Sequence, residues 1–176
     1  MPNFQIIVNF VLFQIGWFAC VLGAAKQLPW AGATVVAAIV IVHLRLAKQA
    51  KPEIILLLIS MLIGGSYDQL MQYHALLSYQ AHGWAAAVVP VWIIALWAVF
   101  VTTLNVSLRW MRGKWLVAVL FGAIGGPLAY LGAEKLGAVT INSPPISYVA
   151  LGFGWAILTP LLLWLSTKFD GFKVDT

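Results

Sequence analysis

Six long runs of apolar residues follow one another along the chain, each close to the length that a helix needs to cross a membrane. A helix must offer about 20 mostly apolar residues to span a hydrocarbon layer of roughly 30 Å. Charged residues, prolines and glycines interrupt the apolar pattern between the runs. Within the runs the hydrophobic and polar positions do not alternate, so β-barrel strands are not expected. The predicted spans are 4–24, 28–47, 53–77, 88–108, 115–133 and 147–166.

The composition supports the same class of protein. Of the 176 residues, 62% are hydrophobic and 9% are charged, and the mean hydropathy is +0.96. A soluble domain carries about a quarter charged residues, so this chain lacks the polar groups that a surface facing water requires. One cysteine, Cys20, cannot form a disulfide framework within the chain. We therefore expect an all-α polytopic membrane helix bundle that forms one domain over residues 1–176.

The distribution of lysine and arginine predicts the orientation. Two of the ten basic residues, Lys26 and Lys135, fall in one set of connections, and eight fall in the other set or in the C-terminal tail. Cytoplasmic loops carry the excess of basic residues, so both termini are predicted to be cytoplasmic. The same signal explains the pI of about 9.6, and no nucleic-acid partner is expected. The eight residues are Arg45, Lys48, Lys51, Arg109, Arg112, Lys114, Lys168 and Lys173.

The third span carries the main candidate for function. Asp68 is the only acidic residue well inside a predicted span, because Glu53 and Glu134 fall at span ends. With 100° per residue, one face of the span collects Asp68 with other polar residues. An ionisable side chain inside a span costs several kcal/mol and usually faces the bundle or a wet cavity. The predicted outer polar layer consists of Tyr67, Asp68, Gln72, His74 and, from the fifth span, Tyr130.

Two interpretations of Asp68 remain open. As a functional group it would carry a proton, bind a cation or act as a general acid or base. As a structural group it would hydrogen-bond to Tyr67, Gln72 or His74 and fix the register of its helix. The first interpretation requires access for a ligand or a proton, and the second does not.

A second polar layer is expected nearer the cytoplasm. At about 1.5 Å per residue, Asn105 lies roughly 15 Å from Asp68 in depth, so the two side chains are not expected to pair. Thr102, Asn105 and Arg109 share one face of the fourth span. This face would suit an anionic head group. Alternatively, Arg109 reaches the interface while the amide of Asn105 bonds across helices. The predicted inner polar layer consists of Asn9, His43, Thr102, Asn105 and Arg109.

Motifs for metals, cofactors and known catalytic sets are lacking. His43, His74 and His82 fall in separate segments without metal-ligand spacing, and no phosphate-binding or dinucleotide-binding glycine pattern occurs. A triad of Ser66, His74 and Asp68 is disfavoured, because Ser66 points away from the polar face on an ideal helix. We expect no metal and no cofactor, and we assign no catalytic residue.

Two segments carry a resemblance to a known family. Residues 95–110, ALWAVFVTTLNVSLRW, and residues 122–130, GAIGGPLAY, resemble a bacterial family of polytopic inner-membrane proteins catalogued as domain of unknown function 2878. The resemblance covers most of the chain, including PLLLW at residues 160–164. It implies a bacterial inner-membrane location and a single compact domain. It implies no activity or substrate.

Three functions compete at this point. In the first, the chain is a binding or accessory protein for a lipid-like ligand or a partner membrane protein. In the second, it is a proton-coupled small transporter that acts as a homo-oligomer, with Asp68 as the titrating group. In the third, it is a membrane-embedded enzyme that modifies a lipid, with Asp68, His74 and Tyr130 as acid, base and orienting groups. The sequence favours the first, because that function needs no catalytic set.

Overall fold

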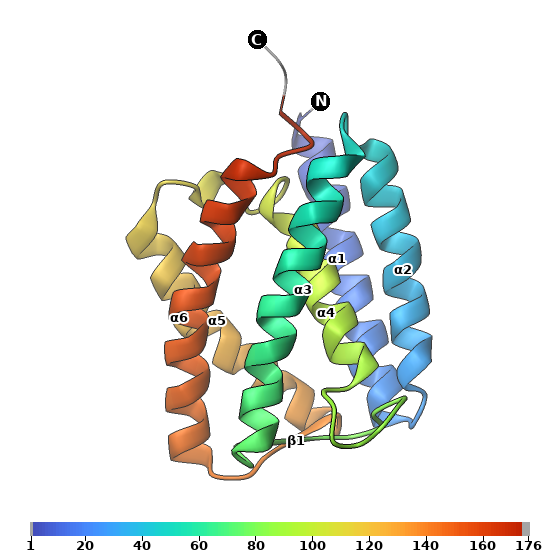
Figure 1. Cartoon of the computed structure of the whole chain (residues 1–176), viewed down its shortest axis with the longest axis vertical. Helices are drawn as coiled ribbons and strands as arrows, with labels where there is room; N and C mark the ends of the chain where they lie inside the picture. Colours follow the sequence, from blue (N-terminus) through green and yellow to red (C-terminus); the bar gives the residue numbers. More distant parts are fainter. Residues whose placement is uncertain (1, 174–176) are drawn as a thin grey trace.

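A computed structural model describes residues 2–173, and these residues form an all-helical bundle with two short strands at one end (Figure 1). Residues 1 and 174–176 of the predicted domain lie outside the described part of the chain. The elements in chain order are α1 (Pro2–Ala25), α2 (Pro29–Leu46), α3 (Ala50–Tyr73), β1 (Leu77–Tyr79), α4 (Val91–Leu104), η1 (Arg109–Met111), α5 (Trp115–Lys135), β2 (Val139–Ile141) and α6 (Pro144–Lys168).

Five helices are long and apolar enough to span a membrane, namely α1, α2, α3, α5 and α6. Their outward-facing side chains are large and apolar, as in Leu62, Leu116 and Phe153, which are 70–72% exposed. Side chains of this kind lower the free energy of a helix when they face lipid, and they would raise it in water. These five helices are therefore consistent with a membrane protein.

The fourth helix is shorter than the predicted span 88–108. It covers 14 residues, or about 21 Å at 1.5 Å per residue, and the chain then turns into the short helix η1. All residues of α4 except Ile94 and Leu96 are buried. A helix surrounded by protein is not required to match the thickness of the hydrocarbon layer, which is why this segment ends early. The count of six full spans stays a prediction.

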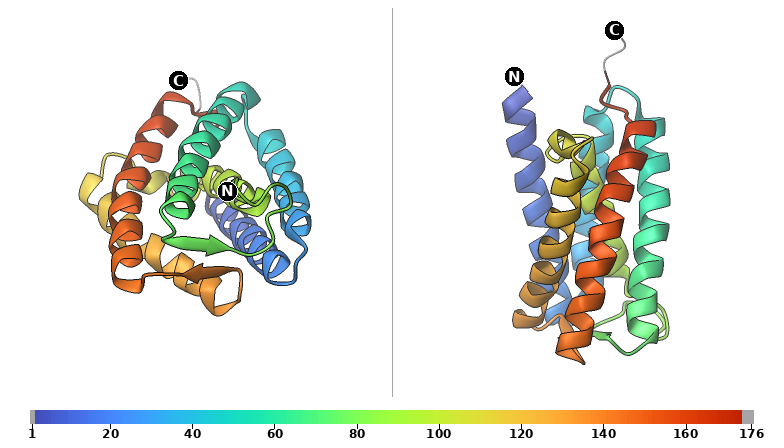
Figure 2. Two further views of the ribbon diagram at one scale, coloured as in Figure 1. Left: turned by 60° about the horizontal axis from the view of Figure 1, so that its bottom comes forward. Right: turned by 90° about the vertical axis from the view of Figure 1, so that its left-hand side faces the viewer.

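Helix α4 lies at the centre of the bundle. It packs against α1, α2 and α3, whereas α5 packs mainly against α6, and the two views in Figure 2 show α4 enclosed by the longer helices. Glycines allow two of the close approaches. A Cβ on Gly32 would lie 2.3 Å from the Cα of Cys20, and a Cβ on Gly122 would lie 2.1 Å from the carbonyl oxygen of Trp155. These contacts bring α2 onto α1 and α5 onto α6.

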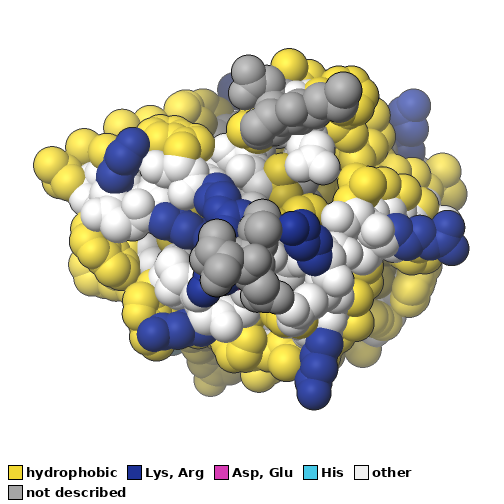
Figure 3. Space-filling model, turned by 90° about the horizontal axis from the view of Figure 1, so that it is seen from above, with side chains coloured by type: hydrophobic (Ala, Val, Ile, Leu, Met, Phe, Trp, Pro, Cys, Tyr) yellow, Lys and Arg dark blue, Asp and Glu magenta, His cyan; other side chains and the backbone are white. Residues whose placement is uncertain are grey.

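The two ends of the bundle differ. At one end β1 pairs with β2 in antiparallel register, with Leu77 opposite Ile141 and Tyr79 opposite Val139. We call this the strand end. At the opposite end, α1 begins and α6 ends (Figure 1), and lysines and arginines surround the face seen in Figure 3. We call this the basic end. The start of α1 and the end of α6 therefore lie at the same end of the bundle. The side of the membrane on which that end lies stays a prediction.

Candidate functional site

The carboxyl group of Asp68 lies inside the bundle and accepts hydrogen bonds from three elements. Asp68 is fully buried on α3. Its Oδ1 accepts from the hydroxyl of Tyr79 on β1 at 2.6 Å and from the hydroxyl of Tyr130 on α5. Its Oδ2 accepts from the indole N–H of Trp97 on α4 at 2.5 Å. One side chain thus joins four segments of the chain.

The local sequence explains why Trp97 reaches this carboxyl. Gly64 lies one turn before Asp68 on α3, and a Cβ at Gly64 would lie 1.9 Å from the Trp97 ring. The missing side chain lets the indole lie flat against α3. The opposite face of the ring stacks on Trp155 of α6, with the centroids 4.8 Å apart and the planes 11° apart. The ring is therefore held from both sides with its N–H towards Asp68.

Tyr79 reaches the carboxyl from outside the helices. Along β1 the side chains of Leu77 and Tyr79 are buried, and that of Ser78 between them is exposed. The strand period of two turns the phenol inward. Burial and the neighbouring carboxyl of Asp68 raise the pKa of Tyr79 well above its ordinary value. The hydroxyl is therefore neutral at physiological pH and available as a donor.

The groups around Asp68 are neutral. Its three donors are two phenols and an indole. The ion pairs of residues 2–173 join His43 to Glu53, and Arg109 and Arg112 to Asp170, and none includes Asp68. Over the same residues no group of three His, Cys, Asp or Glu side chains is arranged to hold a metal ion. The carboxyl of Asp68 is thus buried without a cationic partner among the described side chains.

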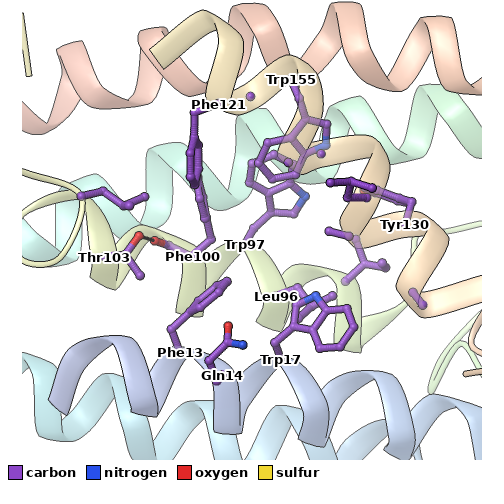
Figure 4. A pocket seen from close by; sticks show the side chains of 18 of the residues that line it. Phe13, Gln14, Trp17, Leu96, Trp97, Phe100, Thr103, Phe121, Tyr130 and Trp155 are labelled. Atoms are coloured by element: carbon purple, nitrogen blue, oxygen red, sulfur yellow. Dashed lines mark hydrogen bonds between the residues drawn. The ribbon is translucent and has the colours of Figure 1, made fainter. Parts of the chain in front are cut away.

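A cavity of about 420 Å³ borders Asp68. Asp68 forms part of its lining, and the walls come mainly from α1, α4 and α5, with the stacked Trp155 of α6 beside them (Figure 4). The lining is almost entirely apolar and rich in aromatic rings. In Figure 4, Phe13, Gln14 and Trp17 lie on one side and Phe121 and Tyr130 on the other, with Leu96, Trp97 and Phe100 between them.

The cavity opens towards the outer surface of the bundle between α1 and α5. Phe10 and Phe18 of α1 and Phe121 and Leu128 of α5 line it, and these four side chains are 44–59% exposed. Partly exposed lining residues from two neighbouring helices mark the rim of an opening. An apolar molecule in the membrane could enter there without crossing water.

The predicted outer layer is only partly one cluster. Asp68 and Tyr130 are joined, as described above. Tyr67 instead donates to the carbonyl oxygen of Ala150 on α6, at 3.1 Å, and Gln72 donates to that of Ala86 in the connection after β1, at 2.9 Å. His74 is exposed, because α3 ends at Tyr73 rather than at residue 77. Of the two interpretations of Asp68, the structural one named Tyr67, Gln72 or His74 as hydrogen-bond partners, and none of the three bonds to Asp68 within residues 2–173.

Two partners of Asp68 were absent from the sequence prediction. Trp97 lies deep in an apolar helix, where a tryptophan gives no sign that its N–H has a specific acceptor. Tyr79 lies in a connection after the third helix, and no periodic pattern links it to the interior. The stripe of polar positions on α3 was the available signal, and it located Asp68 but neither Trp97 nor Tyr79.

The predicted inner layer divides into two clusters. In the first, the side chain of Asn9 on α1 donates to the carbonyl oxygen of Thr102 at 3.0 Å, and its Oδ1 accepts from the hydroxyl of Ser107 at 2.7 Å. The hydroxyl of Thr102 donates to its own helix, at the carbonyl of Val99. This cluster fixes α1 against the end of α4.

The second cluster is built around Glu53, which the sequence placed at a span end. Glu53 is fully buried. Its Oε2 lies 2.8 Å from Nε2 of His43, and its Oε1 accepts from the side chain of Asn105 and, at 2.7 Å, from the backbone N–H of Gly171. His43 and Asn105 thus belong together, as predicted, but they meet through Glu53. The segment after α6 covers this carboxylate, which explains its burial.

Arg109 joins the same end of the bundle through Asp170. The Asp170 Oδ2 lies 2.6 Å from Arg109 and 2.8 Å from Arg112. Arg112 also donates to the side chains of Asn105 and Ser166. The hypothesis that Thr102, Asn105 and Arg109 hold an anionic head group therefore loses its basis, because the chain's own Asp170 and Glu53 occupy the arginine and the amide.

Comparison with known proteins finds one similarity. The family model described as "protein of unknown function (DUF2878)" matches residues 6–161, which is most of the chain. Among curated proteins and among solved structures, none matches.

Proposed function

Because the chain belongs to DUF2878, a family of proteins of unknown function, we propose its function from the geometry: it is a membrane protein that binds a lipid-like ligand in the cavity beside Asp68. The cavity carries the proposal. Its volume of about 420 Å³ falls in the range of roughly 300–1,000 Å³ that small-molecule sites occupy. Such sites combine apolar walls with a few polar groups, as this one does.

The shape of the cavity suits an elongated apolar molecule. Its lining extends from Val139 and Ala133 near the strand end to Ser107 and Leu108 near the basic end. From Trp92 to Thr103, which both line the cavity, the distance along α4 is roughly 16 Å at about 1.5 Å per residue. The opening between α1 and α5 supports entry from the bilayer. In this proposal the protein lies in the bacterial inner membrane, with the basic end in the cytoplasm.

The polar groups favour binding over transport of a hydrophilic solute. The hydroxyls of Thr102 and Thr103 donate to carbonyls of their own helix, so they do not line a polar path. Buried valines and phenylalanine of α4 separate the Asp68 cluster from the Glu53 cluster. A polar solute would lose its hydration there without replacement hydrogen bonds.

Native mass spectrometry of the protein with its co-extracted lipids tests this proposal. The variant Gly125→Leu fills the cavity, because Gly125 lines it and a Cβ there would meet only Phe121, at 4.0 Å. Ala37→Leu is the matched control, since Ala37 is exposed on α2 outside the cavity lining. We expect a retained lipid-like molecule in the wild type and in Ala37→Leu, and its loss in Gly125→Leu. No retained molecule, or equal retention in all three, would contradict the proposal.

A further inference from the structure

We propose that the ligand of this cavity is a cationic amphiphile, whose positively charged nitrogen lies beside Asp68 and whose alkyl chain extends along α4. The inference rests on the proposed binding function and adds the chemical class of the ligand. It follows from the charge of the lining, from its aromatic rings and from its length.

The charge of the lining is the first step. Among the residues that line the cavity, only Asp68 and Tyr130 carry an ionisable side chain. The phenol of Tyr130 is a far weaker acid than the carboxyl of Asp68. Its oxygens accept three hydrogen bonds, while a carboxylate offers about four acceptor positions. A buried carboxylate without a cation is costly, and hydrogen bonds from neutral groups offset only part of that cost. A ligand with a positive charge would stabilise the ionised form of Asp68 and supply the counter-charge that the described side chains do not provide.

The aromatic rings are the second step. The lining includes Trp17, Trp92, Trp97, Trp155 and Tyr130. A cation over the face of an indole or phenol ring gains up to about 2 kcal/mol or more where water is excluded. The Trp17 ring packs against α5, where it lies 3.4 Å from the Cβ position of Gly132, and it also lines the cavity. Figure 4 shows Trp17 and Tyr130 towards the same end of the cavity.

The length of the cavity is the third step. It leaves room for the charged head group of the ligand at one end and for its alkyl chain along the rest. Asp68 and Tyr130 lie towards the strand end, and the lining continues through Phe100 and Thr103 to Leu108 without another charged side chain. An anionic amphiphile would place its charge either against the carboxylate of Asp68 or in this apolar section. The arginines that could attract an anion, Arg109 and Arg112, already pair with Asp170.

The experiment compares three probes that share one alkyl chain and differ in the charge of the head. Decyltrimethylammonium, decanol and decanoate are each titrated onto the protein in phosphatidylcholine nanodiscs, with empty nanodiscs as the blank. For the wild type we expect the ammonium probe to bind at least about tenfold more tightly than decanol, which corresponds to about 1.4 kcal/mol, and decanoate to bind most weakly. Asp68→Asn should remove the preference, so that the ammonium probe and decanol bind with similar affinity.

A second variant keeps the test decisive if Asp68→Asn does not fold. Trp17→Leu retains an apolar wall and changes no hydrogen-bond partner of Asp68, and it should lower the affinity for the ammonium probe several-fold more than the affinity for decanol. Equal affinity of the wild type for the ammonium probe and decanol would overturn the cationic ligand and leave the lipid-like ligand standing. Binding of no probe, combined with no retained molecule in native mass spectrometry, would overturn both.

Discussion

The indole N–H of Trp97 donates to Oδ2 of Asp68 across 2.5 Å, and the same indole ring stacks on Trp155 with 4.8 Å between the centroids. The two tryptophans have nearly parallel rings but different polar surroundings. Trp97 has a hydrogen-bond acceptor, whereas the buried Nε1 of Trp155 has none among the described residues. The pair therefore offers a direct comparison of one indole N–H with a partner and one without.

Replacement of each tryptophan by phenylalanine measures the value of this hydrogen bond. Trp97→Phe leaves a buried carboxyl with one donor fewer, and we expect it to lower the free energy of unfolding by about 1–3 kcal/mol more than Trp155→Phe does. Both variants lose the same part of the ring, so the difference reports the N–H. Reversible unfolding in mixed detergent micelles provides the measurement. An equal loss in both variants would show that the bond to Asp68 contributes nothing net.

Substitution of Gly64 tests how α3 positions the indole. An added Cβ would lie 1.9 Å from the Trp97 ring, so Gly64→Ala should displace the ring and cost at least about 1–3 kcal/mol in unfolding free energy, as overpacking of a core does. Gly125→Ala is the control, because its Cβ meets only Phe121, at 4.0 Å. Thermal unfolding of both variants checks the prediction, which fails if Gly64→Ala is as stable as Gly125→Ala.

Glu53 is expected to hold the segment after α6 in place. Its Oε1 accepts the N–H of Gly171, so Glu53→Leu should release this segment and leave Asn105 and His43 without their partner. Loss of about 1–3 kcal/mol of local stability would speed tryptic cleavage after Lys168 by about fivefold to about a hundredfold. Limited proteolysis measures the rate.

Glu53→Gln is the matched variant for this experiment. Its side-chain oxygen can still accept from Gly171 and Asn105, and its amide can donate to a neutral His43. We expect cleavage close to the wild-type rate. Rapid cleavage of both variants would mean that charge, rather than the hydrogen bonds, holds the segment.

Tyr79 should make stability depend on alkaline pH. Its pKa is raised in the folded protein, so the folded state keeps the phenol protonated where the unfolded state loses the proton. The stabilisation is complete below about pH 10 and is lost as the pH rises towards the folded pKa, at up to about 1.4 kcal/mol per pH unit. Unfolding free energies from about pH 8 to about pH 11 should fall more steeply in the wild type than in Tyr79→Phe. Parallel slopes would contradict this.

The sequence predicted the parts of the site that depend on local pattern. Hydropathy located the helical segments, and the 100° spacing on α3 placed Asp68 towards the interior, where Tyr130 bonds to it. The partners that the prediction missed come from elsewhere in the chain. Tyr79 belongs to a strand that forms only when it pairs with β2, and Gly171 lies 118 residues from Glu53. Neither contact leaves a periodic signal in the sequence.

The limits of the helices account for the remaining differences. The prediction continued the third span to residue 77, which placed His74 on the polar face, but α3 ends at Tyr73 and the next residue turns outward. The prediction likewise extended the fourth span to residue 108, whereas the helix ends at Leu104. Both ends depend on tertiary contacts, since apolar residues continue past each of them.

Among the three donors to Asp68, Tyr79 comes from a strand, whereas Trp97 and Tyr130 come from helices. Because Tyr79 belongs to β1 and its hydroxyl donates to Asp68, a ligand or substitution that displaces the carboxyl of Asp68 should also displace β1. Binding of a ligand in the cavity should therefore change the environment of β1. A spectroscopic label at position 78, where the side chain of Ser78 is exposed, would measure that change.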